Sequence, residues 1–409
     1  MTNEKLWSRN FIALVAANGL LFAGFHVLLP TLPLYVAGLG ASGSEIGLIA
    51  GIFGYSAIFI RLFTDTGVRA FGKKKCLYAG LFCSLLATVG YACFDSIHAI
   101  IAARIIHGFG FGLSTTFAAA LVADVIPASR RGEGIGYFGL GSTIAMALAP
   151  AFGLMLLSDI SAIALFAVSG LASFLALFAA HEDRMPEKEP ELPLPAVHLS
   201  FRNRIYEAGT GIPSVLTILF GAAYGSVNTF IAMMAAEAGI EHAGLFFIVG
   251  TFFIIFSRPF GGRLLDRRGA FAVVIPGALF YSAALGLILI ADSLALLLGA
   301  SILYGLGAGL LLPALMTWML NVVRADRRSA ASATFYNMLD IGTSTGILVL
   351  GSLAGSIGYI AMYQYVLAIM GVFLVFGIVQ HHFSPHRAAN RRNRRSRGVI
   401  YGYNYLAGK

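Results

Sequence analysis

An arginine and a histidine, Arg104 and His107, lie three residues apart in a stretch of sequence that is otherwise apolar. Charge in such a segment costs at least about 2.5 kcal/mol on the insertion scale, so it normally faces a polar partner or water. A guanidinium keeps its proton and can bind an anion or influence a carboxylate. An imidazole titrates near neutral pH and can carry a proton. The alternatives are a structural ion pair or carbonyl clamp for Arg104 and a hydrogen-bonded core histidine for His107.

A second candidate for proton transfer, an acidic residue, occurs late in the chain. Asp340 is the only acidic residue deep in its apolar segment, and it shares a helical face with Asn337 and Ser344. A carboxyl inside a membrane can bind and release a proton, so Asp340 is a candidate proton carrier, the alternative being a buried, hydrogen-bonded acid. His26 is a further candidate in the first apolar segment, with Asn18 on nearly the same face.

The composition indicates an integral membrane protein. Of the 409 residues, 58% are hydrophobic and 11% are charged, whereas a soluble domain has about 25% charged residues. The apolar runs are continuous and of helical length, unlike the alternating segments of a transmembrane barrel. Twelve candidate spans begin near Phe11, Glu45, Cys76, His98, Gly134, Ile160, Gly211, Ala243, Phe271, Ser293, Ala330 and Tyr359.

The spans form two groups of six. We expect six-helix bundles at residues 1–180 and 211–383, a proline-rich cytoplasmic linker at 181–210 and a basic cytoplasmic tail at 384–409. Lysine and arginine concentrate at both ends and in every second loop, which predicts that both termini are cytoplasmic. The tail is expected to contact anionic lipid, and we expect no nucleic-acid partner because no aromatic or folded segment accompanies its charge.

The two groups repeat one another at an offset of 197 residues. Gly108-Phe-Gly-Phe-Gly112 corresponds to Gly305-Leu-Gly-Ala-Gly309, Gly72 to Gly269, and Arg61-Leu-Phe63 to Arg258-Pro-Phe260, whereas Arg104 corresponds to Ser301. Arg61 and Arg258 lie near the inner ends of their spans, so we expect them to snorkel to the cytoplasmic interface. Two parallel repeats place a substrate site between them near mid-membrane, and rocking of the halves gives alternating access.

The second copy contains Gly262-Arg263-Leu264-Leu265-Asp266-Arg267-Arg268-Gly269 between its second and third spans. This loop resembles the signature of the major facilitator superfamily, and the resemblance extends over essentially the whole chain. It implies an all-α membrane protein of twelve transmembrane helices in two six-helix halves with pseudo-two-fold symmetry. Asp266, with Gly262, Arg267 and Gly269, would then latch or gate the cytoplasmic side, as would the turn residues Arg130 and Arg131. The first copy departs from the signature, with Asp65 at its glycine position and Arg69 at its aspartate position.

Two other motifs resemble those of proton-coupled exporters in this superfamily. Arg104 with the glycines of Gly108–Gly112 is similar to the fourth-span motif whose arginine is linked to proton coupling. The segment Ala145–Gly153 is similar to the antiporter motif, with alanines at two of its glycine positions. Pro150 removes a backbone hydrogen bond and bends the helix, so Pro150 and Gly153 are expected to act in gating.

In this family the first, fourth, seventh and tenth spans line the cavity. The residues expected to line it here are Asn18, His26, Arg104, His107, Ser114, Tyr224, Asn228, Tyr304, Asn337 and Asp340. Proton coupling is assigned to Arg104, Asp340, His107 and His26. The alternatives are packing roles for the aromatic residues and bonds to the carbonyls of their own helix for the hydroxyls.

The sequence contains no nucleophile elbow, phosphate loop or metal-ligand spacing, so we expect neither an enzyme, a metal site nor a cofactor. The favoured hypothesis is a monomeric antiporter of the cell membrane, driven by the proton gradient, that exports a drug-like compound or an endogenous metabolite. Arg104, His107 and His26 favour an anionic or zwitterionic cargo, such as an opine-type metallophore or a siderophore. The alternatives are a proton-coupled importer of a sugar or other nutrient and, more remotely, a polytopic membrane enzyme or receptor.

Overall fold

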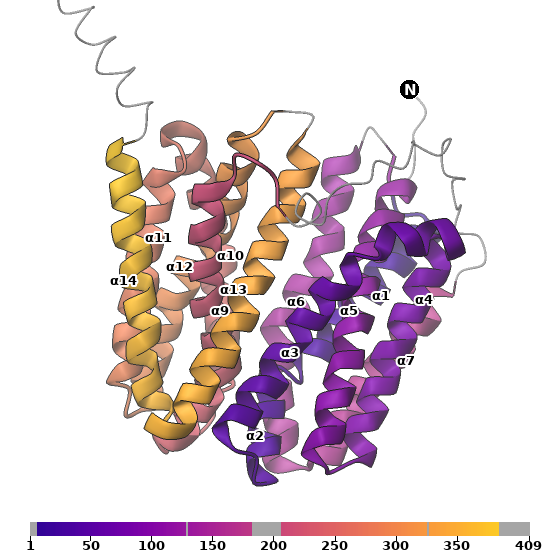
Figure 1. The fold of residues 1–409 in the computed structure, drawn as a ribbon, viewed down its shortest axis with the longest axis horizontal. Coiled ribbons are helices and arrows are strands. Elements are labelled where there is room, and N and C mark those ends of the chain that lie inside the picture. The colour runs from indigo at the N-terminus through magenta and orange to yellow at the C-terminus, as the bar shows by residue number, and fades with distance from the viewer. Residues whose placement is uncertain (1–5, 128–129, 182–205, 325–326, 384–409) are drawn as a thin grey trace, which may run out of the picture.

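The computed structural model describes residues 6–127, 130–181, 206–324 and 327–383, and all of its regular structure is helical (Figure 1). The helices are α1 (Arg9–His26), α2 (Thr31–Gly38), α3 (Gly43–Arg61), α4 (Thr64–Cys93), α5 (Ile97–Val125), α6 (Arg131–Asp159), α7 (Ala162–Ala180), α9 (Gly211–Glu237), α10 (Leu245–Arg268), α11 (Phe271–Leu289), α12 (Leu294–Asn321), α13 (Arg328–Ile357) and α14 (Tyr359–Phe383).

Twelve helical stretches within these ranges are long and apolar enough to cross a membrane, which confirms the expected number. The first stretch, Arg9–Gly38, combines α1 and α2. These two helices are separated by residues 27–30, and Pro30 in this break cannot donate a backbone hydrogen bond. Residues 182–205 of the expected linker and the whole of the expected tail lie outside the described residues.

The helices form two bundles of six spans, α1–α7 and α9–α14 (Figure 1). We call the end at which α1 begins the N side and the opposite end the far side. Because successive spans alternate in direction, the basic residues that end α10 and those that precede α6 and α13 all lie on the N side. The bundles meet on the far side and diverge toward the N side (Figure 1).

The sequence repeat is also a repeat of backbone geometry. Arg104 Nε donates to the carbonyl oxygen of Ile49 at 3.1 Å, and its counterpart Ser301 donates through Oγ to the carbonyl oxygen of Phe246 at 2.5 Å. Ile49 and Phe246 are themselves separated by the same offset. Equivalent hydrogen bonds within the two halves are therefore made by an arginine in the first half and by a serine in the second.

Two equivalent glycines adopt a conformation that other residues rarely take. Gly72 kinks α4 with φ of 80°, and Gly269 ends α10 with φ of 81°. Positive φ carries little penalty for glycine because it has no Cβ. Gly72 therefore bends the chain near the N-side end of α4, and Gly269 turns the chain between α10 and α11.

The bundles contact each other through closely packed backbones of α3 and α13. Gly43 lies against Gly355, and a Cβ added to Gly47 would come within 2.8 Å of the Leu348 carbonyl oxygen. A second contact joins α6 and α10, where a Cβ on Gly244 would meet Ala151 at 3.0 Å. Small residues permit such close approach of helices in lipid, where packing rather than water exclusion drives association. The far-side contact is therefore dense and sensitive to added volume.

We expect Gly47→Ala to destabilise the purified protein, because the added methyl group meets backbone atoms that cannot rotate away. Overpacking of this kind costs about 1–3 kcal/mol. Gly371→Ala in α14 is the matched control, since no atom lies within 4 Å of its added Cβ and alanine favours helix. Thermal unfolding in detergent should show a lower midpoint for Gly47→Ala alone, and equal midpoints would contradict the packing argument.

Candidate substrate and proton site

One ion pair joins the bundles near the point at which they separate. Arg61, the last residue of α3, directs its guanidinium at the carboxylate of Asp340 on α13, and the side chains remain 22% and 33% exposed. The second terminal nitrogen of Arg61 lies 3.5 Å from Thr115 Oγ1 on α5. Toward the far side, Tyr55 and Thr345 share a hydrogen bond of 2.6 Å. Arg61 thus bridges α5 and α13 from its place on α3.

This pairing corrects the prediction that Arg61 snorkels to the interface. Its partner lies 279 residues away in the sequence, on the other bundle. The remaining members of the predicted polar face of α13 differ in exposure: Asn337 is partly exposed, and Ser344 is buried against Gly54 of α3. The acid that the sequence singled out therefore lies at the junction of the two bundles.

Arg104 is buried behind aromatic side chains. Its exposure is 1%, and its guanidinium carbon lies 4.5 Å from the ring centre of Phe53 and 5.8 Å from that of Phe25. Besides the bond from Nε to Ile49, it has a terminal nitrogen, Nη1, with no hydrogen-bond partner. The cation that contacts Asp340 in this conformation is Arg61 rather than Arg104. The Nη1 group of Arg104 is therefore a hydrogen-bond donor that the protein leaves unused in this conformation.

The two candidate histidines are buried with partners of their own. His107 shares a hydrogen bond of 3.3 Å with the Tyr91 hydroxyl and packs edge-on against Phe53. His26 donates from Nδ1 to the carbonyl oxygen of Phe22 at 2.9 Å and stacks on that ring. In this conformation both histidines are therefore buried and hydrogen-bonded, as expected for the alternative prediction of a structural core histidine.

Two other predicted cavity residues of the first bundle are also buried between helices. Asn18 donates from Nδ2 to the Phe138 carbonyl oxygen on α6 at 3.4 Å. Ser114 is buried where α5 packs against Gly80 of α4. Asn18 thus links α1 to α6, whereas the Ser114 hydroxyl is buried without a hydrogen-bond partner.

In the second bundle, three predicted residues lie together, and we call them the tyrosine–asparagine cluster: Tyr224, Asn228 and Tyr304. Asn228 Nδ2 and the Tyr304 hydroxyl oxygen are 2.9 Å apart, and the Tyr304 hydroxyl donates to Asn228 Oδ1 at 3.1 Å. The Tyr224 and Tyr304 rings are nearly parallel, with centroids 6.3 Å apart. Tyr224 and Asn228 are partly exposed one turn apart on α9. The cluster offers hydrogen-bonding groups on an aromatic support.

The predicted gating residues lie on both sides of the bundles. On the N side, Asp266, Arg267 and Gly269 end α10, and Arg130 pairs with Glu133 at 2.8 Å, while the side chain of Arg131 is outside the described residues. Gly262 lies in α10 with no atom near its added Cβ. Pro150 lies inside α6, and Gly153 packs against the carbonyl of Val27, where α1 ends. The predicted antiporter segment therefore contacts the break in the first span.

The sequence did not single out Glu207. Glu207 is buried before α9 and accepts a hydrogen bond from Arg327 Nε at 3.0 Å on the N side. The charge of Glu207 was the only sequence signal for this ion pair, because residue spacing does not indicate which helices contact each other.

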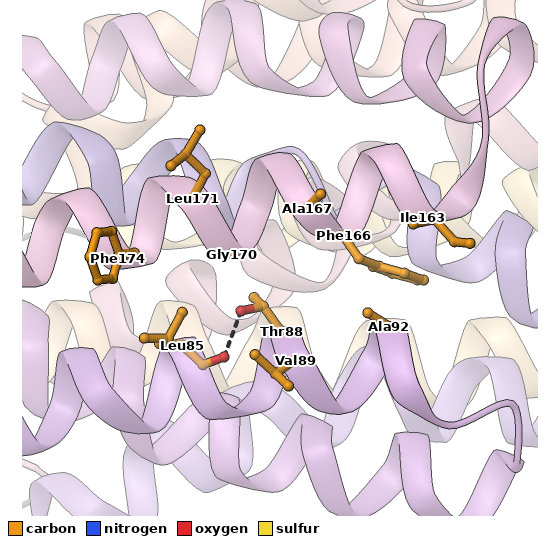
Figure 2. Close-up of a pocket in the computed structure, with 10 residues that line it drawn as sticks. All are labelled: Leu85, Thr88, Val89, Ala92, Ile163, Phe166, Ala167, Gly170, Leu171 and Phe174. Atoms are coloured by element: carbon orange, nitrogen blue, oxygen red, sulfur yellow. Dashed lines mark hydrogen bonds between the residues drawn. The ribbon is translucent and has the colours of Figure 1, made fainter.

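A separate groove lies between α4 and α7 (Figure 2). It is lined by Leu85, Thr88, Val89, Ala92, Ile163, Phe166, Ala167, Gly170, Leu171 and Phe174, and it has a volume of about 360 Å³. The Thr88 hydroxyl donates to the Leu85 carbonyl oxygen at 2.7 Å (Figure 2). An apolar lining with its polar atom already satisfied suits lipid chains, so this groove is distinct from the charged site between the bundles.

Comparison with known proteins identifies the architecture. A family model described as Major Facilitator Superfamily matches residues 14–214 and 213–402. The chain is similar to the staphylopine export protein of Staphylococcus aureus, with 23% identity over 86% of this chain and 91% of the relative. It is 22% identical to the quinolone resistance protein NorA of Staphylococcus aureus, over 82% of this chain and 87% of the relative. It is 25% identical to a multi-drug resistance efflux pump PmrA homolog of Lactococcus lactis, over 96% of this chain and 98% of the relative.

Solved structures show the same fold at lower sequence identity. The peptide transporter POT in complex with sulfate superposes with a TM-score of 0.76 at 15% identity, covering 92% of this chain and 94% of that chain. The nucleoside transporter NupG superposes with a TM-score of 0.70 at 15% identity, covering 90% and 98%.

We expect Arg61 and Asp340 to be coupled in a double-mutant cycle. Arg61→Ala and Asp340→Ala should each lose about as much unfolding free energy as the double variant, giving a coupling of about 1 kcal/mol for a partly exposed pair. The exposed pair Arg130 and Glu133 is the control and should show no measurable coupling. Denaturant unfolding in detergent measures the cycle, and additive losses for Arg61 and Asp340 would show that the contact does not hold the bundles together.

Proposed function

This chain belongs to the major facilitator superfamily and is a membrane transporter rather than an enzyme, and we propose that it is a proton-driven antiporter that exports a small molecule. Three relatives covered over most of their length are named for export, resistance or efflux, which supports outward transport. The α6 segment Ala145–Gly153 supports the same direction, because it resembles the antiporter motif of exporters. Importers with the same fold are the alternative.

The observation that carries the proposal is the ion pair between Arg61 and Asp340. It joins the two bundles in a conformation that is packed on the far side and diverges toward the N side. The distribution of basic loops supports a cytoplasmic N side, with both termini inside. The structure then corresponds to the state that receives cargo from the cytoplasm.

In the proposed cycle, Asp340 exchanges a proton as its distance from Arg61 changes. With Arg61 beside it, the carboxylate is compensated by a cation and gives up its proton to the N side. When the bundles rock to open the far side, the two residues separate, and a lone carboxylate in the membrane binds a proton from outside. Protonation of Asp340 then permits the bundles to return to the state that is open to the N side. Inward proton movement thereby drives outward movement of cargo.

The residues around the pair of Arg61 and Asp340 come from three helices. Arg61 approaches from α3, Thr115 contacts Arg61 from α5, and Tyr336 lies within electrostatic reach on α13 itself. Arg104, His107 and His26, to which proton coupling was also assigned, remain proposed participants whose environment would have to change during transport. No cofactor is needed, because the proton gradient supplies the energy.

The cargo is proposed to be an endogenous metabolite or a drug-like compound, with an anionic or zwitterionic metabolite favoured. The name of the staphylopine export protein supports a metabolite cargo, and an opine-type metallophore or siderophore fits the predicted charge. We further propose that the protein works as a monomer in the bacterial cell membrane, in contact with lipid, cargo and protons.

Deletion cells complemented with wild-type protein should release a compound that deletion cells retain, and should release more of it into acidic than into alkaline medium. Asp340→Asn should abolish this release at unchanged membrane abundance, because an amide cannot exchange the proton. Mass spectrometry of cells and medium measures both pools.

Asp292→Asn, in the far-side loop before α12, is the control and should behave as wild type. Release by Asp340→Asn equal to wild type, or release independent of external pH, would exclude the proposed antiport. Depletion of a compound from the medium by the wild-type protein would indicate import instead.

A further inference from the structure

The two contacts between the bundles are related by the sequence repeat, yet they differ in extent. Gly47 on α3 packs against the Leu348 carbonyl of α13, and the equivalent positions, Gly244 on α10 and Ala151 on α6, also pack together. Both contacts lie toward the far side. Equivalent residues therefore begin both contacts, and the residues that follow toward the N side can be compared pair by pair.

The α3–α13 contact continues to the N-side end of α3. A Cβ added to Gly51 would come within 2.9 Å of the Ser344 carbonyl oxygen, and one added to Gly54 would overlap the Ser344 hydroxyl. The ion pair of Arg61 with Asp340 completes the contact. On this flank of the molecule the bundles are therefore joined along the whole of α3.

The α6–α10 contact does not continue in this way. On α10, Ile248 and Ile255 share the helical face of the glycine contact, and both are exposed. On α6, Leu148, Ile144 and Leu140 share the face of the alanine contact, and all three are exposed. We call these five side chains the α6–α10 seam. They face the opposite helix but are not covered by it.

Two pairs of equivalent isoleucines show that geometry, not residue type, causes the difference. Ile58 on α3 is 9% exposed, whereas its counterpart Ile255 on α10 is 50% exposed. Ile341 on α13 is partly buried, whereas its counterpart Ile144 on α6 is 51% exposed. The bundles are thus joined on the α3–α13 flank and separated on the α6–α10 flank.

The seam has the chemistry of a lipid contact. Its five side chains are aliphatic, whereas the α3–α13 contact includes a hydrogen bond between hydroxyls and an ion pair. Exposed apolar surface of this kind marks contact with a membrane or an apolar ligand. Lipid chains are as apolar as leucine, so a lipid chain and the opposite helix can replace each other at little cost in free energy.

We propose that the α6–α10 seam binds an acyl chain of a phospholipid from the leaflet nearest the N side, and that this chain leaves when α6 and α10 come together. The seam is continuous with the glycine contact between the bundles, so whatever fills it must withdraw before the N side closes. The bound chain therefore stabilises the N-side-open state. This proposal concerns lipid rather than cargo and does not depend on antiport.

Quenching of tryptophan fluorescence by brominated acyl chains measures the lipid contact directly. The two native tryptophans are removed by Trp7→Phe and Trp318→Phe, and Ile255→Trp or Ile144→Trp introduces a single tryptophan at an exposed position of the seam. Each variant is placed in nanodiscs of phosphatidylcholine with brominated or unbrominated chains. Iodide in the buffer measures contact with water.

Three further tryptophan variants calibrate the quenching. Phe178→Trp lies on α7 at a position that is 74% exposed and gives the value for full lipid contact, whereas Phe220→Trp is at a fully buried position and gives the low value. Ile255→Trp and Ile144→Trp should lose at least as large a fraction of their fluorescence to bromine as Phe178→Trp. Ile58→Trp is the symmetry-matched control and should resemble Phe220→Trp, which alone supplies the low value if Ile58→Trp does not fold.

Quenching of the seam tryptophans by iodide instead of bromine would show a water-filled opening and would overturn the proposal. Bromine quenching no greater than that of Phe220→Trp, with no quenching by iodide, would show a covered seam and would overturn it as well. The measurement uses neither cargo nor a proton gradient.

Closure of the N side tests whether the chain leaves. Asp340→Asn should lower the bromine quenching of Ile255→Trp and leave that of Phe178→Trp unchanged. If Asp340→Asn brings the N sides of the bundles together without changing the quenching of Ile255→Trp, displacement of the chain is excluded and the antiporter stands. If that quenching is strong and falls in Asp340→Asn while release of a compound is independent of pH, the lipid site stands and the proton coupling fails.

Discussion

The contact between Arg61 and Asp340 is the interaction on which the rest of the account depends. Either charge alone would be costly inside a membrane, and each is compensated by a residue of the other bundle. The relative position of the bundles therefore decides whether the two charges are neutralised. Because both side chains remain partly exposed, water and protons can reach them. A transporter that exchanges protons needs an acid whose environment changes in this way as the protein moves.

The dense backbone contacts of α3 and α13 give this ion pair a fixed geometry. Gly43 and Gly47 hold the far side together, and Arg61 lies at the other end of the same helix. A small rotation about the glycine contact would produce a larger displacement at Arg61. Packed interfaces favour discrete arrangements over continuous deformation, which suits a protein that must be open to one side at a time.

Much of the fold could be predicted from the sequence because span length, loop charge and the repeat are local or periodic signals. The number of spans and the equivalence of Gly72 with Gly269 follow from such signals. Side-chain surroundings could not be predicted, because neighbouring helical residues differ in direction by about 100° and packing decides which face is covered. Arg104 is thus buried against Phe53, while Tyr224, Asn228 and Tyr304 do lie together. The repeat marked Arg61 and Arg258 as equivalent positions, but the contact of Arg61 with Asp340 could not be predicted, because it depends on how α3 packs against α13.

The most direct test of the central claim is the distance between the N sides of the two bundles. Phe71 and Arg268 are exposed, symmetry-related positions there, and Phe71→Cys with Arg268→Cys in a cysteine-free background would carry spin labels for double electron–electron resonance. With the pair intact at alkaline pH, the account predicts mainly the long distance of the N-side-open state. Adding Asp340→Asn, or lowering the pH, should move population to a shorter distance. An identical distance distribution under all three conditions would contradict the claim that this ion pair controls which side is open.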